Sequence, residues 1–120
     1  MIKLGCMSLS YKDEFAARKL DLEGFIDRAH QLRLDGIDIH TGAFGSTDAA
    51  YLRDIRMRAL RKGVALSYIG VSTNFGFPEP EKLEQQVATT KQWIDVAAFM
   101  GIPLVRVFAA WVRDGDTEEA

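Results

Sequence analysis

The sequence predicts an α/β fold in which a parallel sheet is built from repeated strand-helix units. Four short apolar runs rich in strand-forming residues alternate along the chain with three segments of helical periodicity. Each helical segment ends near a glycine, and the next strand begins within a few residues, as in βα units. Strands in this order form a parallel sheet with right-handed crossovers.

The expected strands comprise residues 3–9, 37–40, 64–69 and 104–110. Their β-branched and aliphatic residues favour extended structure. The first strand contains the only cysteine of the chain, Cys6, which we expect to be a small buried hydrophobic residue. A single cysteine excludes a disulfide framework and fits a reducing cytoplasm.

The first helical segment begins at Asp21, a residue type that favours the N-cap position, and Gly36 is expected to end it. Its apolar residues recur at the spacing of one helix face, and they are Leu22, Phe25, Ile26, Ala29 and Leu32. The preceding residues 10–20 are expected to form a long loop after the first strand. The segment therefore predicts an amphipathic helix that packs on the sheet.

The second helical segment begins at about Thr47 or Asp48 and ends at Gly63. Its expected inward residues are Leu52, Ile55, Ala59 and Leu60. Five basic residues lie mostly on its outer side, and they are Arg53, Arg56, Arg58, Arg61 and Lys62. No aromatic residues interleave with them, and cations near a helix C-terminus already favour the helix dipole, so we do not assign a nucleic-acid patch here.

The third helical segment opens after Pro78 and Pro80 with acidic residues in its first turn, and Gly101 and Pro103 end it. Its expected inward residues are Leu83, Val87, Ile94 and Ala98. The acidic residues 114–120, beyond the fourth strand, resemble the opening turn of a fourth helix.

Composition excludes several classes of protein. The chain has 120 residues, of which 48% are hydrophobic and 27% charged, as in an ordinary soluble globular domain. Fifteen Lys and Arg against 17 Asp and Glu give a net charge of −2, which disfavours nucleic acid or an acidic membrane as the main partner. No long uncharged stretch and no signal-like start is present, so we expect a cytoplasmic protein without a membrane span.

Two architectures share this order of elements: a small doubly wound open sheet of the flavodoxin-like type, and the first half of a TIM (βα)8 barrel. The short chain favours the open sheet. The barrel is favoured by the long loops after the first three strands and by a fourth strand that would otherwise lie uncovered. We therefore expect residues 1–120 to be a single partial domain, the first four βα units of a TIM barrel, with the flavodoxin-like sheet as the alternative.

Several stretches, in this order and at these separations, resemble the xylose-isomerase-like TIM barrels, which include sugar phosphate isomerases and epimerases. They are residues 3–5, 21–27, 34–40, 72–75 with 78–81, 90–97 and 101–108. The resemblance covers the whole chain and implies a barrel of about 250 residues or more, of which this chain supplies about half. It implies that the chain is a fragment of a longer enzyme.

The resemblance implies a metal-dependent sugar or sugar-phosphate isomerase or epimerase that transfers a proton next to a carbonyl. In such enzymes manganese, magnesium or cobalt is held near the ends of the later strands, where two carboxylates serve as acid and base. None of those positions lies in these 120 residues, so we assign no catalytic and no metal-binding residue. We expect the chain alone to bind no divalent cation tightly and to lack isomerase activity.

Other functions stay open at this point. One alternative is a hydrolase or lyase of the same fold, similar to an abasic-site endonuclease or an inosose dehydratase. Another is a half-barrel without catalysis that associates with a second copy, which would cover its exposed strand edges and make it a homo-oligomer.

Strand alternation predicts which residues face the barrel interior, since neighbours along a strand point to opposite sides. Ile37 and Ile39 suit the helix-packed side, which sends Asp38 and His40 inward. His40 lies nearer the C-terminal mouth, where barrels bind their substrates. We expect His40 to bond a sugar hydroxyl or shuttle a proton, the alternative being a purely structural histidine.

Two residues after later strands are further candidates for contact with a sugar or polyol. Asn74 precedes a Gly-Phe-Pro turn, where its side chain either forms the turn or bonds the ligand. Trp111 follows the fourth strand, where its indole either forms a wall against the apolar face of a sugar or caps the barrel rim. Trp93 belongs to the third helix and is expected to pack.

The same alternation predicts a buried ion pair. In the fourth strand it leaves Arg106 and Phe108 inside, and alternate barrel strands contribute side chains to the same interior layer. A buried arginine needs a carboxylate partner, and Asp38 of the second strand is the expected one.

Overall fold

A computed structural model describes residues 1–112 and Gly115. Its strands are β1 (Gly5–Met7), β2 (Gly36–His40), β3 (Ala65–Val71) and β4 (Leu104–Val107). Its helices are α1 (Lys12–Ala16), α2 (Leu22–Gln31), α3 (Ala49–Lys62) and α4 (Pro80–Met100), with short 3-10 turns η1 (Ser8–Tyr11) and η2 (Thr41–Ala43). Within the described residues, no helix is both long enough and apolar enough to cross a bilayer.

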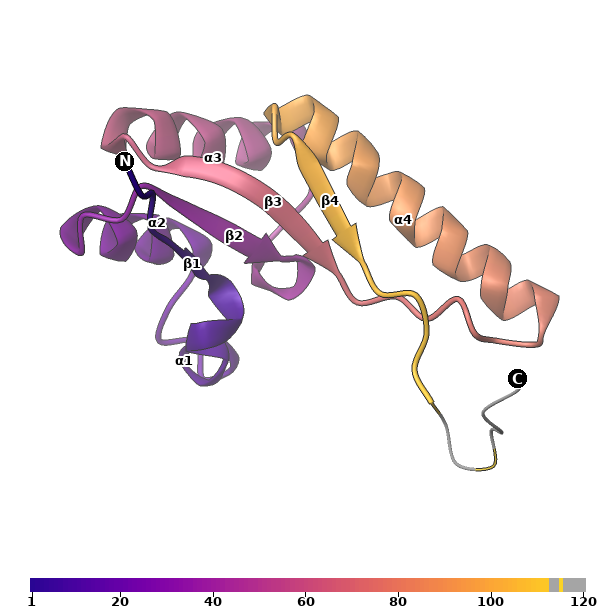
Figure 1. Cartoon of the computed structure of the whole chain (residues 1–120). Coiled ribbons are helices and arrows are strands. Elements are labelled where there is room, and N and C mark those ends of the chain that lie inside the picture. Colours follow the sequence, from indigo (N-terminus) through magenta and orange to yellow (C-terminus); the bar gives the residue numbers. More distant parts are fainter. Residues whose placement is uncertain (113–114, 116–120) are drawn as a thin grey trace.

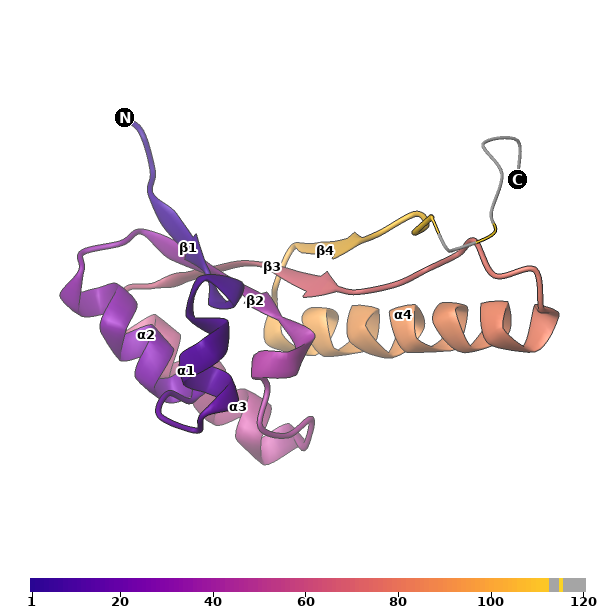
Figure 2. The ribbon, with the colours of Figure 1, turned by 90° about the horizontal axis from the view of Figure 1, so that it is seen from below.

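All four strands are parallel, and their order in the sheet is the order of the sequence, β1-β2-β3-β4 (Figure 1). Figure 2 shows that the helices all lie on one side of this sheet. A doubly wound sheet has helices on both faces and a reversal in its strand order. The predicted half-barrel is therefore confirmed, and the flavodoxin-like alternative is wrong.

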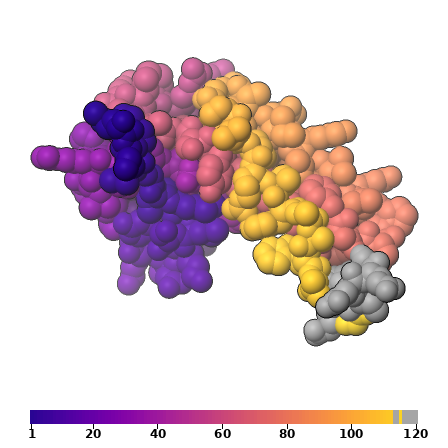
Figure 3. All heavy atoms as spheres, in the orientation of Figure 1, coloured from indigo at the N-terminus to yellow at the C-terminus, as the bar shows by residue number. Residues whose placement is uncertain are grey.

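The hydrophobic core lies between the sheet and the helices. Ile37, Ile39 and Ile69 point from the strands into this layer and are fully buried, as strand alternation predicts. From the helices they meet an apolar set that comprises Leu22, Phe25, Ile26, Ala29, Leu52, Ile55, Ala59, Val96, Ala97 and Met100. The opposite side of the sheet, which we call the helix-free face, is the side seen in Figure 3.

Three of the predicted helix ends are confirmed. The Asp21 carboxylate accepts a hydrogen bond of 2.8 Å from the Gly24 amide and caps α2. Gly63 and Gly101 end α3 and α4 with φ angles of 68° and 70°, in the left-handed region that favours glycine.

Gly36 does not end α2, contrary to the prediction. The helix stops at Gln31, and Arg33 takes the left-handed conformation with a φ of 57°. Gly36 instead begins β2, where a Cβ atom would lie only 2.9 Å from the carbonyl oxygen of Ala65. This glycine therefore allows two strands to approach each other closely.

Several predicted inward faces are also wrong. Leu32 lies beyond the end of α2 and is exposed, and Leu60 on α3 is 69% exposed. On α4 the predicted residues Val87, Ile94 and Ala98 are exposed, whereas the buried residues are Val96, Ala97 and Met100. The 21-residue helix buries side chains only in its last turns, so a face averaged over its whole length is misleading.

The segment expected to be a loop at residues 10–20 contains the end of η1 and all of α1. Tyr11 and Phe15 pack their rings on Phe25 of α2, with centroid separations of 5.7 and 6.0 Å. These aromatic contacts hold the short helix beside the end of β1. The helical turn expected at residues 114–120 lies outside the described residues, apart from Gly115.

The strand register separates the two residues of the predicted ion pair. Gly70 of β3 lies level with His40 of β2 and with Arg106 of β4, whereas Asp38 lies level with Tyr68. None of the ion pairs among the described residues joins Asp38 to Arg106. Strand alternation correctly placed both residues on the helix-free face. It does not predict how far along the strands each residue lies, and a register shift between Ile37 and Asp38 changes that position.

Two neighbouring residues on opposite faces of β2 test this arrangement. Ile39→Ala empties a fully buried position and should lower the free energy of unfolding by about 2 to 5 kcal/mol. Asp38→Ala should change it by less than about 1 kcal/mol, since the carboxylate has no ion-pair partner among the described residues. Urea unfolding measures both. An Asp38→Ala loss as large as that of Ile39→Ala would contradict the register.

Candidate functional site

The candidate site lies where the strands end on the helix-free face, and we call this region the mouth. Parallel strands bring their carboxyl ends to one edge of the sheet, and barrel enzymes place their active sites there. His40 is the last residue of β2, and Ser72 follows β3 directly. The loops after β3 and β4 carry Asn74 and Trp111.

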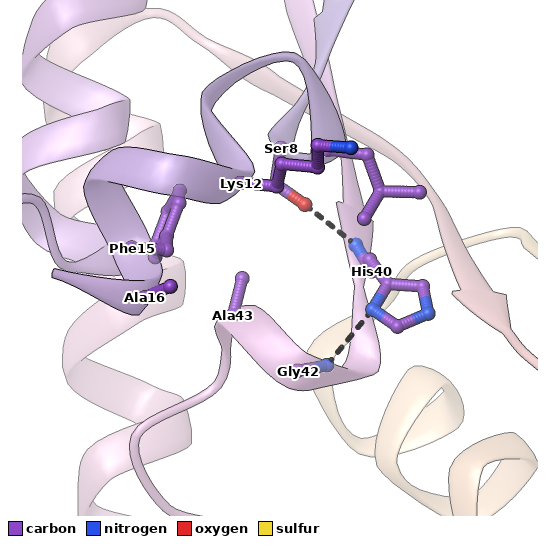
Figure 4. A pocket seen from close by; sticks show the side chains of 8 residues that line it. Ser8, Lys12, Phe15, Ala16, His40, Gly42 and Ala43 are labelled. Carbon is purple, nitrogen blue, oxygen red and sulfur yellow. Dashed lines mark hydrogen bonds between the residues drawn. The ribbon is translucent and has the colours of Figure 1, made fainter.

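The His40 ring is held through both of its nitrogens. Its Nδ1 accepts a hydrogen bond of 3.1 Å from the Gly42 amide (Figure 4), so Nδ1 carries no proton. The proton of the neutral ring therefore lies on Nε2, which donates to Ser72 Oγ at 2.9 Å. The His40 backbone amide donates to Ser8 Oγ at 2.9 Å. Both ring nitrogens of His40 are therefore occupied by hydrogen bonds within the chain.

The pKa of His40 lies below the ordinary imidazole value of 6.5. Partial burial is the larger cause, and the positive charge of Arg106 is the second. Both disfavour the imidazolium ion. His40 is thus neutral at neutral pH, which agrees with the hydrogen bond that its Nδ1 accepts.

A cavity of about 280 Å³ opens beside His40. Figure 4 shows Phe15 and Ala16 of α1 on one side and Ala43 of η2 on another. Two of the residues that line this cavity have ionisable side chains, Lys12 and His40. Sequence reasoning missed this wall because it treated residues 10–20 as an unstructured loop.

Arg106 is held in a defined position on the helix-free face. Its guanidinium carbon lies 4.3 Å from the centroid of the Phe108 ring, a cation–π contact. It also lies directly over Gly70, because a Cβ atom there would come within 2.7 Å of an Arg106 terminal nitrogen. Gly70 therefore provides the space that the guanidinium occupies.

Thr73 joins the two loops that extend β3 and β4. Its hydroxyl donates to the carbonyl oxygen of Phe108 at 2.7 Å and accepts from the Phe108 amide at 2.9 Å. The Trp111 indole Nε1 donates to the Thr73 carbonyl oxygen at 3.1 Å, and its ring lies 4.8 Å from that of Phe108. Trp111 is 53% exposed, so part of the indole faces outward while its hydrogen bond fixes its position.

Asn74 belongs to the same loop junction. Its Oδ1 accepts hydrogen bonds from the Gly76 amide at 2.9 Å and from the Trp111 amide at 3.3 Å. The oxygen is therefore occupied, and the side-chain NH₂ group is the part that can donate to a ligand. The turn-forming role and the ligand-binding role weighed for Asn74 are compatible.

The structure thus brings Asn74 and Trp111 into contact and places His40 across β3 from Arg106. Ser72 and Thr73 were missed as site residues. Ser72 could have been found from alternation, because it lies two positions beyond Gly70 and so on the same side of the chain. Nothing in the sequence indicates the Thr73 bonds, which depend on the path of a distant loop.

The described residues do not fit a divalent-cation centre. Within residues 1–112 and Gly115, no group of three or more His, Cys, Asp or Glu side chains lies close enough together to hold a metal ion. Asp38 is the only carboxylate on the four described strands. We therefore assign no metal ligand in this part of the chain.

The lowered pKa of His40 makes a prediction about stability. The unfolded imidazole has a pKa of about 6.5 and the folded one a lower value, so between them the unfolded chain binds more protons. The contribution of His40 to stability is present above pH 6.5 and is lost as the pH falls through this window. The free energy of unfolding should therefore fall less between pH 7.5 and pH 5 in His40→Gln than in the wild type. The matched control is His30→Gln, and equal behaviour of both variants would contradict the assignment.

No protein-family model and no curated protein matches the sequence. Two solved structures are similar in fold. D-psicose 3-epimerase from Clostridium cellulolyticum H10, in crystals with D-tagatose, superposes with a TM-score of 0.70 at 15% identity, over 82% of this chain and 36% of the epimerase. A xylose isomerase domain protein from Planctomyces limnophilus gives a TM-score of 0.63 at 12% identity, over 97% and 44% of the two chains.

The chain spans less than half the length of either of these proteins. Sequence identities this low establish the fold and not the reaction. The match extends over most of the chain, and it agrees with the sequential parallel sheet and the helices on one face. The chain therefore has the fold of half of a TIM barrel, as found in these two proteins.

Proposed function

We propose that the chain supplies the first half of an isomerase or epimerase that transfers a proton next to the carbonyl of a sugar or sugar phosphate. The observation that carries this proposal is the mouth itself, where His40 with Ser72, Asn74 and Trp111 gather at the strand ends. Barrel enzymes bind substrates at this end. The fold shared with a D-psicose 3-epimerase adds support.

The exposed groups of the mouth match the surface of a sugar. A sugar or polyol offers hydroxyl oxygens on its edges and an apolar face of C–H groups. In our proposal the Asn74 NH₂ group and the Ser72 hydroxyl bond such oxygens, and His40 positions Ser72. The exposed part of the Trp111 indole covers the apolar face.

The groups that move the proton are not assigned to these residues. The described strands lack a pair of facing carboxylates, and the described residues do not fit a metal centre. In our proposal the acid, the base and the expected manganese, magnesium or cobalt belong to the remaining strands of the barrel. This half binds and orients the substrate, which is a small molecule rather than a nucleic acid or a membrane.

Solvent exchange tests the reaction class directly. A base that removes the proton next to a carbonyl returns a solvent proton, so the complete enzyme in D₂O should place deuterium at that carbon. Proton NMR of ketopentoses and ketohexoses, with and without phosphate groups, detects the exchange even when the equilibrium lies far to one side. Turnover without deuterium incorporation, or with loss of water, would contradict the proposal and favour a hydride shift or a lyase.

The two tryptophans provide a matched test of the site. Trp111→Ala removes the indole at the mouth and should lower kcat/KM for a sugar roughly 2- to 10-fold, because an aromatic contact contributes about 0.5 to 1.5 kcal/mol. Trp93→Ala removes an indole from α4 that packs on Phe44 at 5.1 Å. It should lower the melting temperature and leave kcat/KM of the folded enzyme unchanged. If Trp111→Ala behaves like Trp93→Ala, the role of Trp111 is structural.

A further inference from the structure

We propose that the mouth binds an anionic group of the substrate, a phosphate ester or a carboxylate, through the Arg106 guanidinium and the Ser72 hydroxyl. The inference rests on the proposed function and narrows its substrate class from sugars in general to acidic sugar derivatives. It concerns the ends of β3 and β4. Barrels that bind phosphate more often use the loops after their seventh and eighth strands.

Hydrogen-bond direction makes Ser72 a donor. The Gly42 amide donates to His40 Nδ1, which leaves the imidazole proton on Nε2, and Nε2 donates to Ser72 Oγ. Ser72 Oγ already accepts this bond, so its own proton is the part left to bond a ligand. Successive bonds in one direction polarise one another, which strengthens the last donor in the chain.

Arg106 adds a second hydrogen-bond donor beside the Ser72 hydroxyl. The guanidinium has five N–H donors and no acceptor, and its planar fork matches the oxygens of a carboxylate or phosphate. Among the described residues it has no carboxylate within ion-pair distance. Its position is nevertheless defined by the Phe108 ring and by the space over Gly70. A positioned cation without a protein counter-charge is suited to an anionic ligand.

In our proposal the two donors share one anion, because they lie on adjacent strands near the same edge of the sheet. Ser72 follows Gly70 by two residues, and Gly70 is the register partner of Arg106 on the adjacent strand. Adjacent strands are about 4.8 Å apart, and a residue step of two along a strand covers about 6.6 Å. The Arg106 guanidinium lies over Gly70, so it already reaches the strand that leads to Ser72. A tetrahedral phosphate or a planar carboxylate offers several acceptor oxygens, so one group can accept from both residues.

Inorganic phosphate is the first probe, and the two histidines of the chain report on its binding. Burial and, as the second cause, the charge of Arg106 lower the pKa of His40. An anion beside Arg106 offsets that charge, so phosphate should raise the pKa of His40 in an NMR titration. The charged groups around His40 are Arg106 from β4 and Lys12 from α1, which lines the adjacent cavity. His30, which bonds the Lys62 carbonyl oxygen on the helix side of the sheet, is the control, and its NMR signals should not respond to phosphate. An unchanged His40 titration at saturating phosphate would overturn the proposal.

A matched pair of arginine variants assigns the binding. Arg106→Met keeps an unbranched apolar side chain and removes the guanidinium and its charge, and it should weaken phosphate binding at least about tenfold, as expected for a charge-assisted hydrogen bond. Arg53→Met is the control, since Arg53 also stacks on a ring, that of Phe99, but lies on α3. Ser72→Ala should weaken binding by a smaller factor. Equal phosphate affinity of the wild type and Arg106→Met would overturn the proposal.

Kinetics separate this inference from the proposed function. With the complete enzyme, Arg106→Met should lower kcat/KM for a ketose phosphate or a sugar acid at least about tenfold and leave that for the neutral ketose nearly unchanged. Comparing the phosphate with the sugar acid identifies the anion. Equal losses on neutral and anionic sugars would overturn the anion site while leaving the isomerase intact. Deuterium exchange in neither class of sugar would instead refute the proposed function, whereas the phosphate titration would still report on the anion site.

Discussion

Right-handed crossovers between strands in sequential order place every described helix on one face of the sheet, and the rest of the structure depends on this constraint. Because the helices bury one face, the alternate residues of β2 separate into two chemical classes. Ile37, Ile39 and Ile69 enter the core, and Asp38 and His40 point the other way. Polar groups can gather on the helix-free face because the hydrophobic side of the same strands holds the sheet in place.

On the helix-free face, the alignment of neighbouring strands determines which polar side chains lie side by side. The register places Gly70 between His40 and Arg106, so a residue without a side chain separates the imidazole from the guanidinium. The guanidinium occupies the space over this glycine. Partial burial, and after it the charge of this guanidinium, lowers the pKa of the imidazole. The neutral imidazole in turn orients Ser72. The chemistry of the mouth therefore follows from strand alignment as much as from residue type.

Local signals in the sequence predicted the order of elements, the Asp21 cap and the ends at Gly63 and Gly101, because caps and turns depend on neighbouring residues. Quantities that depend on tertiary packing were not predictable. The buried face of α4 depends on which of its turns meet the sheet, and the alignment of Asp38 with Tyr68 depends on a register shift. Of the candidate site, strand parity predicted the side on which the residues lie, but not the bonds to Ser72 and Thr73.

The bonds of Thr73 to Phe108 have a consequence for how a ligand is received. Together with the Trp111 indole bond and the backbone bond from the Phe75 amide to the Ala109 carbonyl oxygen, they tie the segment that follows β3 to residues 108–111, which follow β4. A recognition surface built this way is ordered before the ligand arrives, so little conformational entropy is lost on binding. This side of the mouth is therefore a preformed surface, fixed by the fold of the chain itself.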